Sequence, residues 1–405
     1  MKNITVDDAI NRVRARALAP VVETVVLAKG PGRVLASDVA ATRDQPPFNA
    51  SAMDGYAVRR DSLLPKAKTL TLHVVGESSA GRAYPGGVAV GEAVRIFTGA
   101  PMPAGCDAII IQEHVTRRDG VIDIGPEGRH PLQGHIRRAG QDFRAGDILL
   151  EAGVRLDPWW LSLAAAAGRD RLDVHRRPKI VVLCTGDELV LPGEKPKADQ
   201  IYESASHALI ALIKQWGGKA RYLGVRADDA KAIQKALKGA DADLIVTVGG
   251  ASVGDYDLVK PALQKLGLSL DFESVAVRPG KPTSFGVLTN GIRVLGLPGN
   301  PASAFVTAQL FLKPWIESSL GMTQAPAFIT AISQTPLPAA GPREAYLRAH
   351  LSCSQQGQLQ VTAFDDQDSS LVSVFARADV LIRLPANAPS QKAGARVDVL
   401  PLDRL

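Results

Sequence analysis

The sequence has little that would support a disulfide framework, a thiolate metal site or a membrane anchor. Its three cysteines, Cys106, Cys184 and Cys353, are far apart and show no C-x-x-C spacing. This pattern argues against structural disulfides and zinc sites and is typical of a reducing compartment. The N-terminal segment lacks an apolar core of signal-peptide length, and no run of about 18 apolar residues occurs. We therefore expect a soluble, cytoplasmic protein without membrane contact.

The sequence also lacks a lysine-rich tail or basic block. Lys and Arg total 47 against 41 Asp and Glu, which gives a formal net charge of +6. Such a small excess is typical of an ordinary, mildly basic surface, so it favours anionic small ligands and does not imply nucleic acid. No internal repeat or low-complexity segment is visible. A chain of this length predicts about two to four domains.

Glycine motifs of other enzyme classes are incomplete. Residues 250–254 match the G-x-S-x-G pattern of serine esterases around Ser252. A serine esterase needs a histidine downstream as its general base. The only histidine after Ser252 is His350, in the last β-rich region, which argues against this role. The PGKP segment is not a P-loop, because the first glycine of that motif would fall at Val275. We interpret Ser252 as a hydrogen-bond donor in an anion-binding turn and keep a serine esterase as an alternative.

The first half of the chain reads as one long domain that carries another. Thr5–Asp8 resemble a capping box at the start of an amphipathic helix. Short β-type runs separated by Gly and Pro turns follow, and helical character returns at 158–168. We expect a discontinuous, elongated N-terminal domain at residues 1–45 and 143–176, and a β-rich inserted domain at residues 46–142.

The second half predicts two further domains. From residue 177 to 322, short apolar strands alternate with helices of about ten or more residues. This order predicts a central three-layer α/β domain with a mostly parallel sheet, in which ligands bind beyond the carboxyl ends of the strands. Residues 323–405 contain several β-type runs and predict a small, β-barrel-like domain. The expected fold class is multidomain α/β plus β.

Residues suited to a phosphorylated ligand follow the expected strands of the α/β domain. They are Thr185–Glu188, Asp228–Asp229, Gly249–Asp257 and Pro298–Pro301, with Arg278–Pro282 beside them. Glycines let backbone N–H groups approach phosphate, Lys and Arg supply charge, and carboxylates bind Mg²⁺. Each segment alone is explained equally well by helix caps and turns. Their clustering at one sheet edge indicates a binding site.

Several segments, in order along nearly the whole chain, carry a family resemblance. They are SAMDGYAV (51–58), IFTGAPMPAGCDAII (96–110), RRAGQDFRAGDILL (137–150), TGDEL (185–189), GGASVGDYDLVK (249–260), RPGKPTSFG (278–286) and GLPGNPAS (296–303). Together they resemble the molybdopterin molybdenumtransferase family, which includes the C-terminal domain of gephyrin.

The resemblance implies the last step of molybdenum cofactor synthesis. Adenylylated molybdopterin and molybdate are the implied substrates, Mg²⁺ assists, and AMP leaves as molybdenum is inserted into the dithiolene. An elongated homodimer with a site shared between subunits is also implied. Other cofactor-synthesis proteins and apo-molybdoenzymes are further implied partners. The alternative is a non-catalytic dimeric scaffold that binds pterin or partner proteins, because gephyrin relatives use this architecture as a scaffold.

Functional positions can be carried over motif by motif. The implied catalytic residues are Asp54, Thr98, Asp142, Glu188, Asp228 and Asp257. The implied metal ligands are Asp257, Asp228 and Glu188. The expected substrate-binding residues are Ser252, Arg278, Lys281, Pro282, Arg348 and Ser369, and Ser370 is an alternative to Ser369. Molybdate is a dianion and AMP carries phosphate, so the cations have an evident purpose. Asp54 and Asp142 are expected to contact the pterin or the metal's waters, and their alternative role is turn capping.

Overall fold

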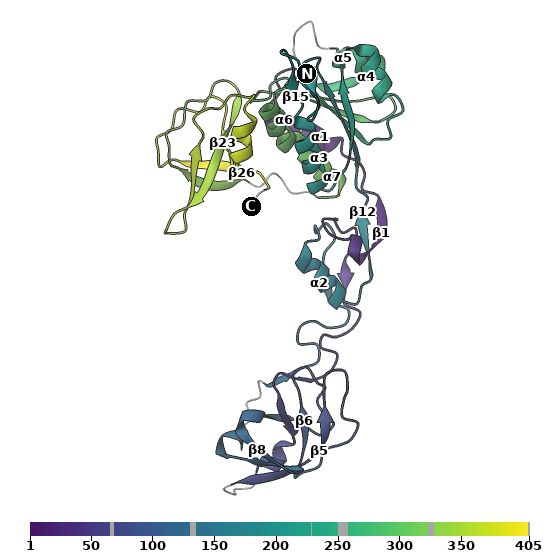
Figure 1. The fold of residues 1–405 in the computed structure, drawn as a ribbon, viewed down its shortest axis with the longest axis vertical. Coiled ribbons are helices and arrows are strands. Elements are labelled where there is room, and N and C mark those ends of the chain that lie inside the picture. The colour runs from purple at the N-terminus through teal and green to yellow at the C-terminus, as the bar shows by residue number, and fades with distance from the viewer. Residues whose placement is uncertain (65–68, 130–134, 228, 250–257, 323–327, 404–405) are drawn as a thin grey trace.

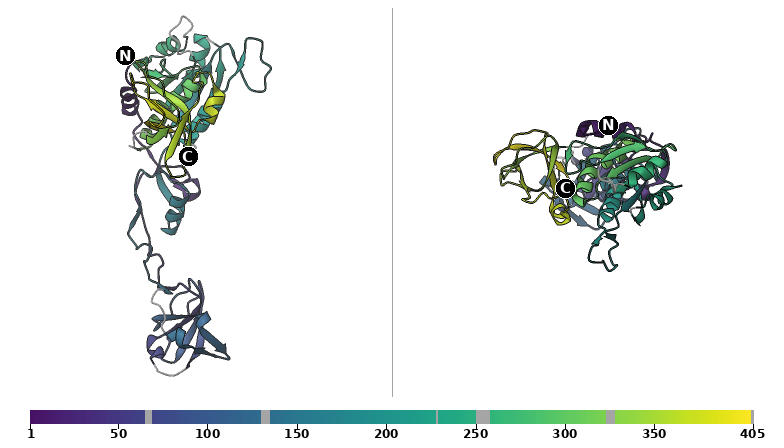
Figure 2. Two further views of the ribbon diagram at one scale, coloured as in Figure 1. Left: turned by 90° about the vertical axis from the view of Figure 1, so that its left-hand side faces the viewer. Right: turned by 90° about the horizontal axis from the view of Figure 1, so that it is seen from above.

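The chain forms an elongated molecule, with a β-rich domain at one end and an α/β domain beside a β-barrel at the other (Figure 1). The computed structural model describes residues 1–64, 69–129, 135–227, 229–249, 258–322 and 328–403. A narrow arm connects the two ends, and the view turned by 90° shows the same separation (Figure 2). No helix among the described residues is long and apolar enough to cross a membrane. The β-rich domain of one chain is therefore far from the α/β domain and the barrel of the same chain.

The first helix, α1 (Val6–Ala15), packs on the α/β domain. Its N-cap is Thr5, whose Oγ1 accepts a hydrogen bond from the backbone N–H of Asp8, as the capping-box pattern predicts. The buried face of α1 joins the same apolar core as Trp315. The sequence had assigned this segment to the elongated domain, but in the structure its packing partners are α7 and the turn before it.

The arm is built from two stretches that are distant in sequence. The chain runs out along one side and returns along the other, with antiparallel pairing between them. Helix α2 (Pro158–Ala166) packs on this ribbon, and the Asp157 carboxylate caps it by accepting the N–H groups of Trp159 and Trp160. The paired elements are β1 (Val22–Val26) with β12 (Arg171–His175) and β2 (Val39–Ala40) with β11 (Ile148–Leu150). A 3₁₀ turn, η1 (Leu27–Lys29), follows β1.

The inserted domain is a six-stranded, curled mixed sheet. Its strand order is β7-β4-β6-β5-β9-β8, and its core contains Tyr56, Val58, Ile110 and Ile122. Two short strands outside this sheet, β3 and β10, pair with each other in antiparallel fashion. The strands are β3 (Ala50–Ser51), β4 (Gly55–Val58), β5 (Leu70–Ser78), β6 (Glu92–Ile96), β7 (Ala108–Ile111), β8 (Val115–Arg118), β9 (Val121–Ile124) and β10 (Ile136–Arg137). The 3₁₀ turns are η2 (Arg60–Leu63), η3 (Gln112–His114) and η4 (Pro126–Arg129).

The α/β domain has three layers around a six-stranded sheet of order β16-β13-β17-β21-β20-β18. The first four strands are parallel, and β20 and β18 add an antiparallel edge. Helices α4 and α5 cover one face, while α3, α6 and α7 cover the other (Figure 1). The strands of this sheet are β13 (Lys179–Thr185), β16 (Lys219–Arg226), β17 (Leu244–Val248), β18 (Ser269–Phe272), β20 (Ser284–Val287) and β21 (Arg293–Leu297). Strands β14 (Leu189–Val190) and β15 (Ile201–Tyr202) form a separate parallel pair. The helices are α3 (Ala205–Gln215), α4 (Ala230–Leu237), α5 (Val259–Lys265), α6 (Pro301–Thr307), the π-helical turn η6 (Ala308–Leu312) and α7 (Lys313–Ser319).

The C-terminal domain is a closed barrel. Closure follows from the pairing of β23 with both β24 and β25, which are linked through β22 and β26. Strand β19 (Val277–Arg278) of the preceding domain pairs with β23, so Arg278 lies at the junction with the barrel. The predicted class, multidomain α/β plus β with a β-barrel-like end, is confirmed. The barrel elements are β22 (Ile329–Ser333), β23 (Glu344–Cys353), β24 (Leu359–Ala363), α8 (Val372–Arg377), β25 (Val380–Leu384) and β26 (Arg396–Pro401).

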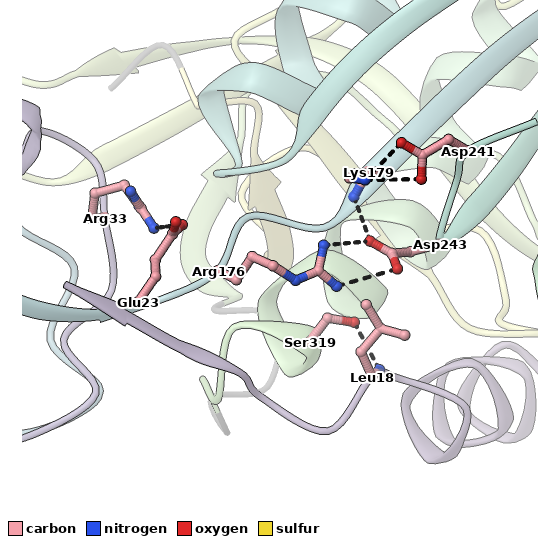
Figure 3. Close-up of polar contacts among 8 residues, drawn as sticks. All are labelled: Leu18, Glu23, Arg33, Arg176, Lys179, Asp241, Asp243 and Ser319. Atoms are coloured by element: carbon pink, nitrogen blue, oxygen red, sulfur yellow. Dashed lines mark hydrogen bonds and ion pairs between the residues drawn. The ribbon is translucent and has the colours of Figure 1, made fainter. Parts of the chain in front are cut away.

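Polar contacts fix the joint between the arm and the α/β domain (Figure 3). Arg176, which directly follows β12, donates from Nη1 and Nη2 to the Asp243 carboxylate at 3.0 and 3.2 Å. The same carboxylate accepts the backbone N–H of Lys179 at 2.7 Å. A forked arginine–carboxylate pair fixes direction as well as distance. The end of the arm is therefore held to the first strand of the sheet.

We expect Asp243→Asn to lower the free energy of unfolding by about 1 to 2 kcal/mol, because the partly buried Arg176 loses its charged partner. Urea unfolding followed by circular dichroism measures this change. Asp241→Asn is the matched control: among the described residues Asp241 pairs only with the exposed ammonium of Lys179, so this substitution should leave the free energy of unfolding nearly unchanged. Equal losses in the two variants would show that the joint does not depend on this pair.

Candidate active site

A cavity of about 1160 Å³ lies at the carboxyl ends of β13, β17 and β21, where the α/β domain faces the barrel. This is the sheet edge at which ligands of parallel α/β domains bind. The wall contains the predicted residues Glu188, Arg278, Lys281, Pro282 and Ser369. The fold therefore brings together side chains from the strand ends, from the RPGKP turn and from the barrel.

The glycine at the end of β17 allows two strand ends to approach each other closely. Gly249 has a φ of 93°, and a Cβ on it would lie 2.4 Å from the carbonyl oxygen of Thr185. A side chain at this position would therefore require a backbone shift. The cavity floor between the ends of β13 and β17 is formed by backbone, which can come close to a ligand.

The RPGKP turn is fixed in place and presents two cations. Gly280 has a φ of 117°, and a Cβ on it would lie 2.2 Å from Cγ2 of Thr307 in α6. The hydroxyl of Thr283 donates to the carbonyl oxygen of Gly280 at 2.7 Å. The side chains of Arg278 and Lys281 are exposed at the cavity. A rigid turn thus holds two positive charges where an oxyanion can reach them.

Arg348 lies beneath the loop that bears Ser369. The side chain is 1% exposed, and its Nη2 donates to the carbonyl oxygen of Asp368 at 2.8 Å. The amide oxygen of Gln367 accepts the backbone N–H of Arg348 at 2.9 Å. Burial lowers the pKa of Arg348, and the nearby carboxylates of Asp366 and Asp368 offset part of this effect. Arg348 therefore supports the loop from behind and places a buried charge near the Arg278 side of the cavity.

The two candidate serines of this loop make different contacts. Ser369 Oγ accepts a hydrogen bond from Asn300 Nδ2 at 2.7 Å, and the Ser369 carbonyl accepts the backbone N–H of Ala302 at 3.1 Å. Ser370 donates from both its backbone N and its Oγ to Asp368, at 2.8 and 2.6 Å. The Ser370 hydroxyl hydrogen is thus engaged. The hydroxyl hydrogen of Ser369 can still be donated to a ligand.

Asp54 and Thr98 form a hydrogen-bonded pair in the inserted domain. Asp54 Oδ1 accepts the backbone N–H and the hydroxyl of Thr98, both at 2.8 Å. The backbone N–H and then the hydroxyl lower the pKa of Asp54, so the carboxylate is ionised at neutral pH. Arg95 stacks over the rings of Tyr56 and Phe97, the neighbours of this pair in β4 and after β6. The segments that bear Asp54 and Thr98 are therefore held together.

We expect Thr98→Val to raise the pKa of Asp54, because the hydroxyl that favours the ionised form is lost while the backbone donor remains. The hydrogen bonds act on the ionised carboxylate, so their contribution is present above the ordinary aspartate pKa and is lost as pH falls through the lowered one. Carboxyl chemical shifts in an NMR pH titration report this directly. Thr98→Ser is the control and should preserve the wild-type pKa.

The remaining predicted residues do not form one cluster within the chain. Asp54 and Thr98 belong to the inserted domain and Asp142 to its junction with the arm, and Figure 1 shows this domain at the other end of the molecule from the α/β domain that bears the cavity. Glu188 is exposed at the cavity. Ser252, Asp228 and Asp257 lie outside the described residues, and within the described ranges no group of three or more His, Cys, Asp or Glu is placed to hold a metal.

Two further residues at the cavity were not found by sequence reasoning. Arg343, from the loop before β23, adds a third cation to the wall. Glu203 is 2% exposed, and its Oε1 accepts the backbone N–H of Ser206 at 2.7 Å, so it caps the start of α3. Arg343 stands in no glycine or strand-end motif, and only the fold places it here. Glu203 was detectable as an acid just before a helix.

Models of three family regions match the chain in order. Residues 4–168 match the MoeA N-terminal region (domain I and II), and residues 181–318 match a probable molybdopterin binding domain. Residues 330–402 match the MoeA C-terminal region (domain IV). The matched regions together cover the arm, the inserted domain, the α/β domain and the barrel.

Full-length relatives carry the same assignment. The chain is 36% identical to the molybdopterin molybdenumtransferase of Haemophilus influenzae, with 99% of each chain covered. It is 34% identical to molybdopterin molybdenumtransferase 2 of Mycobacterium tuberculosis, with 96% of each covered. The solved structure of the molybdopterin biosynthesis MoeA protein from Pyrococcus horikosii superposes with a TM-score of 0.81 at 30% identity and full coverage of both chains. The chain therefore belongs to the MoeA family and is an enzyme of the molybdopterin molybdenumtransferase type.

Proposed function

We propose that this enzyme catalyses the final step of molybdenum cofactor synthesis. Molybdate and adenylylated molybdopterin are the substrates, and AMP leaves as molybdenum enters the dithiolene. The observation that carries the proposal is the strand-end cavity, with a backbone floor at Gly249 and a wall bearing Arg278, Lys281 and Arg343. Molybdate and phosphate are both tetrahedral oxyanions, and several cations on the wall of one cavity suit both.

Each group of cavity residues has a distinct role in this proposal. Lys281 and Arg278 bind the oxyanions, and the Ser369 hydroxyl donates a further hydrogen bond. Arg348 holds the Ser369 loop and adds a buried positive charge behind it. Opposed charges in a partly enclosed site interact more strongly than on the surface, so these cations favour ligands with two negative charges. AMP and molybdate both meet that requirement.

The carboxylate positions are suited to magnesium. Glu188 presents an exposed carboxylate at the cavity, and oxygen ligands of this kind are those that Mg²⁺ prefers. We propose that Glu188 binds Mg²⁺ together with Asp228 and Asp257, which the sequence places after neighbouring strands. Bound there, Mg²⁺ would polarise the phosphoanhydride that releases AMP. Glu188 itself would fix the orientation of the phosphate relative to Lys281.

We further propose that the active unit is a homodimer. Asp54, Thr98 and Asp142 belong to the inserted domain and its junction with the arm, and this domain is at the opposite end of the molecule from the α/β domain (Figure 1). A second copy must therefore supply them if they act at the strand-end cavity. The ionised Asp54 would then accept hydrogen bonds from the pterin's amino and ring N–H groups. Transfer of the finished cofactor to apo-molybdoenzymes, with other cofactor-synthesis proteins, in the cytoplasm completes the proposal.

Molybdate binding separates the transferase from a scaffold. We expect Lys281→Ala to weaken molybdate binding to the AMP-loaded protein by about tenfold or more, because a charge is removed beside a dianion. Calorimetric titration measures the affinity, and molybdate-dependent AMP release from adenylylated molybdopterin measures turnover. Lys235→Ala, an exposed lysine on α4, is the control. Wild-type protein that neither binds molybdate nor releases AMP would be a scaffold.

A further inference from the structure

A second cavity, of about 680 Å³, lies where the arm meets the α/β domain. Its lining residues come from β1 and the turns after it, from the start of β12, and from the segments that lead into β13 and β16. Lys219 is the first residue of β16, so this cavity is at the amino ends of the parallel strands. The candidate active site is at their carboxyl ends. The two cavities are therefore on opposite edges of the sheet.

The wall of this second cavity is strongly basic. Its described lining residues include the cations Lys29, Arg33, Arg171, Arg177 and Lys219, and the one acid among them is Glu23. These cations come from two parts of the molecule, since Lys29, Arg33 and Arg171 belong to the arm and Arg177 and Lys219 to the edge of the α/β domain. Like charges that converge on one cavity repel each other unless an anion is bound.

Arg33 is a buried cation in the wall of this cavity. Its side chain is 7% exposed, and its Nη2 donates to Glu23 Oε1 at 2.6 Å (Figure 3). The same Nη2 also donates to the carbonyl oxygen of His175 at 2.8 Å. The Nε of Arg33 is buried and has no hydrogen-bond partner among the described residues. A buried guanidinium N–H without an acceptor is costly.

The other cations of the wall are poorly neutralised by the protein. Within the described residues Lys29, Arg177 and Lys219 have no acid at ion-pair distance, and Arg171 has only Asp170, at 4.0 Å and itself 94% exposed. Nearby Arg176 and Lys179, in contrast, are matched by Asp243 and Asp241 (Figure 3). Around this joint, the cations of the cavity wall are thus less well neutralised than their neighbours Arg176 and Lys179.

Arg177, like Arg33, has a buried N–H donor without an acceptor among the described residues. Its Nη2 donates to the carbonyl oxygen of Pro31 at 3.2 Å, while its Nε is buried and has no partner in the part of the chain that is described. Burial, followed by the charge of Arg33, lowers the pKa of Arg177. The cavity therefore contains two guanidinium groups that each have an unused, desolvated donor.

We propose that this cavity binds a small multivalent oxyanion of the pyrophosphate type, which bridges the arm and the α/β domain. Guanidinium groups bind phosphate oxygens through paired N–H donors, and the exposed lysines supply additional charge at the rim. Nucleic acid fits less well, because the charge converges on one cavity and does not form a stripe along the surface. The proposal does not rest on the activity proposed for the strand-end cavity.

Calorimetric titration of inorganic pyrophosphate into the full-length protein at low salt tests the proposal. To reduce the contribution of the strand-end cavity, where Arg278 and Arg343 remain, all variants are made in the Lys281→Ala background. We expect the background protein to bind pyrophosphate, and Arg177→Gln and Lys219→Gln each to weaken that binding by about fivefold to tenfold. The double variant should lose less than the two losses added, because both residues contact one ligand. Lys235→Gln, on the distant helix α4, should leave the affinity unchanged.

Stability measurements distinguish loss of the site from loss of the fold. Lys219 is exposed, so Lys219→Gln should keep the wild-type melting temperature without ligand. Pyrophosphate should raise the melting temperature of the background protein and not that of the double variant. No pyrophosphate binding by the background protein, or equal binding by the double variant, would overturn the proposal.

Discussion

A heterodimer of Asp54→Asn and Lys281→Ala chains is expected to recover about half of the wild-type activity, although each variant homodimer is nearly inactive. In a two-fold symmetric dimer whose sites each use Asp54 of one chain and Lys281 of the other, one site of the heterodimer carries both defects and the other carries none. Chains with two different affinity tags allow the heterodimer to be purified. Molybdate-dependent AMP release then measures the recovery.

This experiment has a sharp alternative. If both residues acted in a site within one chain, each site of the heterodimer would carry one defect and no activity would return. The control is a tagged heterodimer of wild-type and doubly substituted chains, in which each site carries one defect under the two-chain arrangement and should be inactive. Activity in that control, and none in the first heterodimer, would contradict the homodimeric site.

The second large effect is expected at Glu188. Glu188→Gln keeps the size of the side chain and removes its charge, so turnover at saturating substrates should fall by about a hundredfold, which corresponds to about 2.7 kcal/mol of transition-state stabilisation. The apparent affinity for Mg²⁺ should fall in parallel. Steady-state AMP release as a function of Mg²⁺ concentration measures both quantities.

Glu194→Gln is the matched control for Glu188→Gln. Glu194 is an exposed glutamate in the segment between β14 and β15, shortly after Glu188, and among the described residues its carboxylate accepts only the backbone N–H of Leu191 in a turn. We expect it to keep nearly full activity and the wild-type Mg²⁺ dependence. An unchanged Mg²⁺ dependence in Glu188→Gln would show that Glu188 is not a metal ligand and only lines the cavity.

The α/β domain was predictable because its central strands have an unambiguous pattern. In β13 every residue from Ile180 to Thr185 is buried, since helices cover both faces of the sheet. Such continuous apolar runs between helices identify parallel strands. The antiparallel edge of β18 and β20 was not resolved from the sequence, because short runs interrupted by Gly and Pro resemble turns.

The sequence indicated which types of residue form the candidate site, but not how they are arranged. The glycine and proline motifs indicated the strand ends, where Gly249 and Gly280 have positive φ angles. The motif match identified Arg348, but nothing in the sequence indicated that this arginine is buried beneath the loop that it supports. The second basic cavity could not be predicted at all. Arg33 and Arg177 belong to distant parts of the sequence and meet only because the arm folds back on itself.

The pairing at the far end of the arm has a consequence for how this architecture can change. Gln45 and Phe143 form an isolated bridge, with the N–H of Gln45 bonded to the carbonyl oxygen of Phe143 at 2.9 Å. The chain therefore leaves for residues 46–142 and returns from them at adjacent points, as at the ends of a tolerated domain insertion. A short turn joining these two residues would close the arm without altering its register. An exchange of residues 46–142 would therefore replace the β-rich domain as a unit, together with Asp54 and Thr98. The strand-end cavity belongs to the other end of the molecule and would keep its residues.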